Sequence, residues 1–327
     1  MISIQNLTKQ FGETIAVHNL SFDVGEGQVF GLIGPDGAGK TTTLRVISTA
    51  MRPTSGVVTV GGIDVARDPG AVNQLIGYMP QRFALYPDLT VIENMNFFAD
   101  LFGAPRAERA ALIARLLGFS RLTEFQTRLA RNLSGGMQKK LALAATLMHT
   151  PRVLLLDEPT TGVDPVSRRE FWDLLTEVRL QGRAISPIEE RALQTDPKGE
   201  SAREVTIVIS TPYLDEAERC TRVGLMYRGQ LIACDDPRRL RDGMRAAAFE
   251  AQSEHALRAR KLIERSEGVL TVSTHGDLLR VLVDRAERAA SIQTAWQTNG
   301  IAVSDLRAVK PRLEDAFVLM LAKFSIQ

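Results

Sequence analysis

The stretch GPDGAGKT, residues 34–41, decides the fold of this chain. It matches G-x-x-x-x-G-K-[ST], a glycine-rich loop whose backbone N–H groups bind phosphate, and we call it the phosphate loop. The apolar run 28–33 before it predicts a buried strand, and residues 42–49 after it predict a helix. Strand, glycine loop and helix start are the context in which this motif binds a nucleotide. Lys40 is therefore predicted to contact the β- and γ-phosphates, and the Thr41 hydroxyl to bind Mg²⁺.

The composition indicates a globular protein of two domains. The chain has 327 residues and a net charge of +2, with both signs interspersed. It carries no basic block or RNA-binding signature, so we expect no nucleic-acid partner. The longest apolar runs, such as 141–148, are too short to span a bilayer, and residues 1–6 lack the features of a signal peptide. Cys220 and Cys234 have neither metal nor redox spacing, so we expect a soluble protein of the reducing cytoplasm.

The pattern of residues 1–243 predicts an α/β domain to which an antiparallel β subdomain and a helical subdomain are added. Alternating polar and apolar residues at 2–24, and a second pair at 57–65, predict an antiparallel β subdomain. From about 90 to 150 the period changes to that of helices. Continuous apolar runs at 153–156 and 205–209 predict buried parallel strands. The polar segment 182–204 before the second of them predicts an exposed insertion, either a solvated loop or a segment with a regulatory or partner-docking role.

After Gly243 the pattern restarts and predicts a small α+β domain over 247–327. Strands and helices are expected in the order β-α-β-β-α-β, which is the ferredoxin-like arrangement. A closing helix follows at 313–323. No catalytic constellation appears in this part, so we expect a regulatory or dimer-contact domain. The elements are expected at 247–252, 255–265, 269–273, 278–283, 285–298 and 301–309.

Two carboxylates end a predicted buried strand in LLLDEP, residues 154–159. In a P-loop fold this strand end lies beside the phosphate loop. Asp157 is therefore predicted to hold Mg²⁺, and Glu158 to polarise the attacking water as general base. Gln81 ends another strand where the core joins the helical part, a position suited to sensing the γ-phosphate and the metal.

The segment LSGGMQ, residues 133–138, is a second device for binding phosphate, since a serine and two glycines open a helix. We call it the signature segment. One chain has no use for two such devices on one nucleotide. The simplest explanation is a dimer in which each signature segment closes the nucleotide site of the other subunit.

The order of these motifs, with Gly162-Val163-Asp164 after them, resembles that of the ATP-binding subunit of an ABC transporter. The resemblance covers residues 1 to about 240 and implies a P-loop NTPase cassette. Such a cassette has a RecA-like core, an antiparallel β subdomain and a helical subdomain, and it uses ATP and Mg²⁺. It implies that Phe11 stacks on adenine beside Val17, that the signature segment binds γ-phosphate in trans, and that Asp164 couples two sites. The nucleotide-binding residues implied in this way are Phe11, Val17, Gly34, Pro35, Asp36, Gly37, Ala38, Gly39, Lys40, Thr41, Thr42, Ser134, Gly135, Gly136 and Asp164. The catalytic residues are Glu158, Lys40 and Gln81, and the metal-binding residues are Thr41, Gln81 and Asp157.

Finer features resemble one class of this family. LSGGMQ in place of LSGGQ and the sequence PRLEDAF at 311–317 resemble drug-resistance exporters of the ABC-2 type. GPDGAGKTT and the segment STPYLDEAE at 210–218 resemble the first cassette of exporter ATPases with two cassettes in one chain. The resemblance implies separate membrane permease subunits, a second cassette as homo- or heterodimer partner, and a place on the cytoplasmic face of the inner membrane.

One position departs from the family pattern. Where a histidine normally follows the strand and contacts the γ-phosphate, this chain has Pro212. Proline offers neither a side-chain donor nor a backbone N–H. Either Glu158 suffices, or, as we favour, this chain's own site turns ATP over poorly while its signature segment completes the site of a histidine-bearing partner.

Three other functions compete with an exporter subunit. A translation factor of this superfamily usually has two cassettes and a basic linker, and this sequence shows neither. A DNA-repair ATPase of the SMC type needs a long coiled coil between the phosphate loop and the signature segment. A regulatory subunit that binds nucleotide and hydrolyses little stays open because of Pro212.

Overall fold

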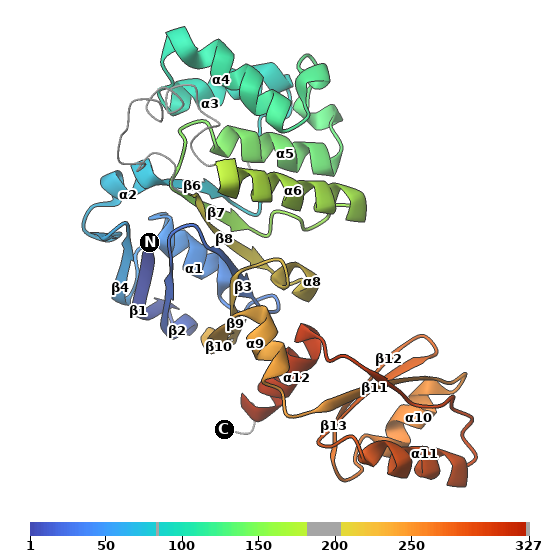
Figure 1. Cartoon of the computed structure of the whole chain (residues 1–327). Helices are drawn as coiled ribbons and strands as arrows, with labels where there is room; N and C mark the ends of the chain where they lie inside the picture. Colours follow the sequence, from blue (N-terminus) through green and yellow to red (C-terminus); the bar gives the residue numbers. More distant parts are fainter. Residues whose placement is uncertain (83–84, 182–203, 325–327) are drawn as a thin grey trace. The chain divides into compact units, whose positions relative to one another are not determined.

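The computed structural model describes residues 1–82, 85–181 and 204–324 (Figure 1). The chain forms two compact units, Met1–Cys234 and Asp235–Gln327, which we call the N-terminal and C-terminal units. The insertion expected at 182–204 lies outside the described residues except for Glu204. Within the described ranges, no helix is both long and apolar enough to cross a membrane.

An antiparallel sheet forms the first part of the N-terminal unit. It has the strand order β2-β1-β4-β5. The predicted antiparallel pairing is confirmed, since β1 and β2 form a hairpin with partners from Ile2↔Val24 to Phe11↔Thr14. The inward side chains of β1, including Ile2, Ile4 and Leu7, are at most 2% exposed and join the core under this sheet. The strands are β1 (Ile2–Phe11), β2 (Thr14–Val24), β4 (Ser55–Val60) and β5 (Ile63–Asp64).

A second sheet, with the order β10-β9-β3-β8-β7-β6, positions the nucleotide motifs. Every residue of β3, β7 and β8 is buried, which fits the continuous apolar runs of these strands. β8 pairs in parallel with β3 on one side and with β7 on the other, so the ends of these three strands meet. The strands are β3 (Val29–Ile33), β6 (Ile76–Met79), β7 (Val153–Asp157), β8 (Thr206–Thr211), β9 (Arg222–Tyr227) and β10 (Gln230–Asp235).

Helices form the predicted helical subdomain and cover the sheet (Figure 1). α3 begins with a capping box in which Thr90 and Glu93 bond each other's backbone N–H groups, a strong signal for a helix start. α5 begins at the signature segment, with Ser134 as its N-cap. The helices of this unit are α1 (Lys40–Ile47), α2 (Pro69–Leu75), α3 (Val91–Leu101), α4 (Arg106–Phe119), α5 (Gly135–Thr146), α6 (Pro165–Gln181) and α8 (Leu214–Ala217).

The C-terminal unit has the predicted ferredoxin-like arrangement, with the sheet order β12-β13-β11-β14. α10 and α11 supply Ala259, Ile263, Ile292 and Trp296 to its core. The strand expected at 301–309 is wrong for its first part, because only Arg307–Val309 pairs with β11. The elements are α9 (Pro237–Asp242), β11 (Ala247–Gln252), α10 (Ala256–Ile263), β12 (Val269–His275), β13 (Leu278–Val283), α11 (Arg288–Thr298), β14 (Arg307–Val309) and α12 (Leu313–Phe324).

Candidate nucleotide-binding site

The phosphate loop joins β3 to α1, as predicted. Gly39 has a φ of +99°, a conformation that favours glycine. A Cβ at Gly39 would lie 2.6 Å from the carbonyl oxygen of Ala16, and one at Gly34 would lie 2.3 Å from that of Met226. Both glycines are therefore required by the close approach of neighbouring backbone.

Lys40 turns back over the phosphate loop. Its Nζ donates to the carbonyl oxygens of Gly34, at 2.8 Å, and Pro35, at 3.1 Å. The same ammonium lies 3.3 Å from Glu158 Oε1, and the Lys40 side chain is only 3% exposed. Since an ammonium has three donors, this arrangement uses all of them within the chain. A phosphate group at the loop would have to take over some of these contacts.

The predicted metal ligands Thr41 and Asp157 lie together. Thr41 Oγ1 donates to Asp157 Oδ1 at 2.9 Å. Asp157 is fully buried, and its other oxygen, Oδ2, is buried without a hydrogen-bond partner in the described structure. A buried carboxylate oxygen without a partner is costly, and a hydroxyl with a carboxylate is the oxygen set that Mg²⁺ prefers. These two residues fit a magnesium ion.

Glu158 lies at the start of the turn after β7. Its φ of +47° is unusual for a residue other than glycine. Gln81 Nε2 donates to Glu158 Oε2 at 2.8 Å, and Thr161 Oγ1 donates to the same oxygen at 3.4 Å. The structure therefore joins Gln81, from the loop after β6, to the predicted general base.

Two contributors to the site were not predicted from the sequence. Ser210, at the end of β8, bonds to Asp157 and to the backbone of Glu158. Tyr78, on β6, is half-buried near Asp157, and this burial, followed by the negative charge of Asp157, raises the pKa of Tyr78 to about 12. Ser210 lies in the segment 210–218, but that segment assigns the serine no role, and Tyr78 belongs to no motif, so only the pairing of the strands reveals their place in the site.

A pocket of about 320 Å³ lies over the phosphate loop. Besides the residues of the loop, Ala16, Gln81 and Glu158 line it. Val17, next to Ala16, is fully buried and packs beside Gly39. Phe11 is 46% exposed at the end of the β1–β2 hairpin, with the Lys9 ammonium 5.0 Å from its ring centre. Adenine stacking on Phe11 stays a prediction.

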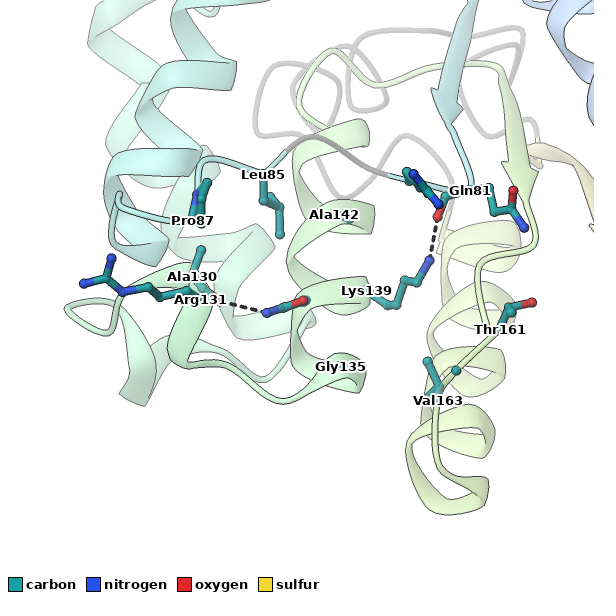
Figure 2. A pocket seen from close by; sticks show the side chains of 13 residues that line it. Gln81, Leu85, Pro87, Ala130, Arg131, Gly135, Lys139, Ala142, Thr161 and Val163 are labelled. Atoms are coloured by element: carbon teal, nitrogen blue, oxygen red, sulfur yellow. Dashed lines mark hydrogen bonds between the residues drawn. The ribbon is translucent and has the colours of Figure 1, made fainter.

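The signature segment does not line this pocket. Ser134 Oγ accepts from the N–H of Met137 at 3.3 Å and so caps α5. Gly135 borders a neighbouring cavity of about 350 Å³, shown in Figure 2. In the lining of that cavity, Lys139 Nζ donates to the carbonyl oxygen of Gln81 at 3.1 Å. The pKa of Lys139 is lowered by burial, and the negative charges of Glu158 and Asp157 offset only part of this effect.

Asp164 and Pro212 lie on the loops after β7 and β8. Asp164 Oδ1 accepts from the N–H groups of Val166 and Ser167, both at 3.0 Å, and caps α6. The hydrogen bonds from Ser167 are the main cause of its lowered pKa. Pro212 directly follows β8, where the family histidine is expected. It brings no donor to that position.

Comparison with known proteins agrees with this geometry. The profile of the family described as "ABC transporter" matches residues 17–161. The chain is 39% identical over 329 residues to the probable multidrug ABC transporter ATP-binding protein YbhF of Escherichia coli (strain K12), covering 98% of this chain but only 52% of YbhF. The chain thus spans about half the length of that relative.

Two further proteins match over most of their own length. The daunorubicin resistance ATP-binding protein DrrA2 of Streptomyces coeruleorubidus is 34% identical over 325 residues, which cover 97% of this chain and 94% of DrrA2. Among solved structures, the dimeric bacterial ABC transporter cassette MJ0796 is 26% identical with a TM-score of 0.59, covering 72% of this chain and 98% of that one. The chain thus has the phosphate loop, the paired carboxylates and the signature segment, and it matches DrrA2 over 94% of the length of that protein. The chain belongs to the family of ABC transporter ATP-binding proteins.

Proposed function

We propose that this chain binds and hydrolyses ATP with Mg²⁺ to power export through separate ABC-2 type membrane permease subunits. The observation that carries the proposal is the meeting of Lys40, Thr41 and Glu158 at one pocket, with Asp157 bonded to Thr41 just beneath it. The names of similar proteins, which include multidrug transport, daunorubicin resistance and Nod factor export, support export as the work performed. Under this proposal the chain is a peripheral protein on the cytoplasmic face of the inner membrane.

The residues of the pocket divide the chemistry among them. On ATP binding, the Lys40 ammonium would leave its ion pair with Glu158 and contact the β- and γ-phosphates instead. The Glu158 carboxylate would then be free to accept a proton from the attacking water. Thr41 and Asp157 would hold Mg²⁺, which supplies charge neutralisation at the phosphates. Gln81, bonded to Glu158, would sense both the γ-phosphate and the metal.

The helical subdomain offers a surface for the permease. A row of rings runs from Tyr86 through Phe97 and Phe98 to Phe102, with successive ring centres 4.5 to 6.3 Å apart. Tyr86 is 45% exposed, Phe102 40% and the adjacent Leu101 62%. An exposed apolar patch of this kind is typical of a protein–protein contact. We infer that it contacts a membrane subunit.

Purification of the tagged chain from detergent-solubilised membranes tests this function. A polytopic membrane protein should copurify and should change the ATPase rate, and Leu101→Asp should release it without weakening ATP binding. The proposal would be contradicted if the chain is recovered without a membrane protein and its ATPase rate is the same with and without membranes.

We further propose that the ATPase unit is an asymmetric pair of cassettes. The signature segment lies outside this chain's own nucleotide pocket, which supports a role in a partner's site. Ser134, Gly135 and Gly136 would then bind the partner's γ-phosphate at the start of α5. Pro212 gives this chain's own site one donor fewer, which supports a heterodimer with a histidine-bearing cassette.

Replacement of Pro212 by histidine tests the asymmetry. The isolated chain should hydrolyse ATP weakly, and Pro212→His should raise the rate by about tenfold or more, since a single well-placed donor contributes on this scale. Ser134→Arg should silence the heteromeric complex while leaving ATP binding by this chain intact. Phosphate release measures each rate. Vigorous hydrolysis by the unmodified isolated chain would contradict the asymmetric pair.

The C-terminal domain, residues 247–327, is proposed to regulate the cassette or to contact its dimer partner. The buried Arg280 of this domain forms ion pairs with Asp315 and Glu250. These charges therefore have a structural role in the domain, and we assign them no catalytic role. We predict that a chain ending after Asp235, the last residue of β10, keeps its ATP affinity but changes its assembly or transport. Nucleotide titration and light scattering measure these properties. A truncated chain that stays folded but loses ATP binding would contradict this role.

A further inference from the structure

We propose that Ser210 is a positioning residue that holds both carboxylates of the nucleotide site, and the proposal rests on the proposed function. β8 lies between β3, which leads to the phosphate loop, and β7, which ends in Asp157. In the register of the sheet, Asp157 is paired with Ser210, and Ile33 with Thr211. The end of β8 therefore adjoins both nucleotide motifs.

The Ser210 hydroxyl connects two residues with different roles. It accepts from the N–H of Glu158 at 3.0 Å, so its own hydrogen is directed elsewhere. That hydrogen is donated to Asp157 Oδ1, at 2.7 Å. Ser210 is fully buried, so water does not compete for either bond.

At Asp157 the serine fixes one oxygen and leaves the other free. Ser210 and Thr41 both donate to Oδ1, whereas Oδ2 has no partner among the described residues. A carboxylate with one oxygen fixed by neighbours presents the other in a set direction, as outer-shell groups do for metal ligands. Ser210 thereby orients the side chain that we expect to hold Mg²⁺.

At Glu158 the serine supports an unfavourable backbone conformation. The φ of +47° needs support from its surroundings to persist. The Glu158 N–H bonds to the Ser210 hydroxyl and also to its carbonyl oxygen, at 3.1 Å. The turn that aims the Glu158 carboxylate at Lys40 and Gln81 is thus fastened to β8 at one residue.

The affinity of the full chain for ATP, with Mg²⁺ and with EDTA in its place, tests this role without requiring hydrolysis. The ratio of the two affinities is the magnesium enhancement. Ser210→Ala should still bind ATP measurably in EDTA, but its magnesium enhancement should fall by about 10- to 100-fold, the usual loss when an outer-shell partner is removed. Ser210→Thr keeps a hydroxyl and should restore the enhancement.

Thr206→Val is the matched control. Thr206 lies at the opposite end of β8 and is 1% exposed. Its hydroxyl accepts from the N–H of Gly27 at 3.0 Å, and the valine lacks this hydroxyl. A merely structural effect of losing a buried hydroxyl would appear in both variants, whereas the positioning role predicts a normal enhancement in Thr206→Val. If Ser210→Ala does not fold, Ser210→Cys, with a weak donor of similar size, should show the loss instead.

The outcomes separate this inference from the proposed function. A folded Ser210→Ala or Ser210→Cys chain with the full magnesium enhancement would overturn the positioning role alone. An unmodified chain that binds ATP equally with and without Mg²⁺, or not at all, would overturn both.

Discussion

Glu158→Gln is expected to lower ATP hydrolysis by about 10²- to 10⁴-fold, the usual contribution of a general base, while ATP affinity is kept or raised. Glu158 Oε1 lies 3.3 Å from Lys40 Nζ, so the carboxylate competes with phosphate for this ammonium. The amide removes that competing charge and the proton acceptor together. The rate is best measured in the Pro212→His chain, whose own site we expect to be active.

Glu216→Gln provides a control for loss of a buried carboxylate near the same loops. Glu216 is 1% exposed and accepts from Thr160 at 2.6 Å, without contact to Lys40. A folded Glu216→Gln chain should keep most of its ATP hydrolysis. Unchanged hydrolysis in Glu158→Gln, measured in the Pro212→His background, would remove Glu158 from the role of base.

Lys40→Ala is expected to weaken ATP binding by about 100-fold or more, because hydrogen bonds to charged groups contribute about 1.5–3 kcal/mol each. The Lys40 side chain is 3% exposed and its ammonium is held over the phosphate loop, so little freedom is lost when phosphate binds. Its removal also leaves Glu158, 7% exposed, without its cation and facing the phosphates. Both effects oppose nucleotide binding.

Lys139→Ala is the matched control for Lys40→Ala. Lys139 is a second lysine of this region, and it donates to the backbone of Gln81 rather than lining the phosphate pocket. It should change ATP affinity far less than Lys40→Ala. Equal ATP affinity in the Lys40→Ala and unmodified chains would contradict the role given to Lys40.

Much of the fold could be predicted because its signals are local. The buried runs of β7 and β8 and the spacing around the phosphate loop depend on residues adjacent in sequence. So does the alternation of elements in the C-terminal unit, whose sheet has the expected order. The strand expected at 301–309 is shorter, since apolar residues such as Ile301 enter the core from irregular backbone instead of a ladder.

The site could be predicted only where a motif carries it. Lys40, Thr41, Asp157 and Glu158 lie in two short motifs, and the bond between Thr41 and Asp157 joins them as expected. Ser210 is 53 residues from Asp157, and its contact exists because β8 pairs with β7. Local periodicity does not specify which strands become neighbours, so residues that act through contacts between strands could not be predicted from the sequence.

The most direct test of the account is the ATP affinity of the full chain with Mg²⁺, compared among the unmodified, Lys40→Ala and Lys139→Ala chains by calorimetric titration. We expect saturable binding of ATP by the unmodified and Lys139→Ala chains. For Lys40→Ala we expect a loss of affinity of about 100-fold or more, from the charge-assisted bonds that Lys40 makes. A folded unmodified chain that does not bind ATP would contradict the proposed nucleotide site, and so would a Lys40→Ala chain that binds ATP as tightly as the unmodified chain.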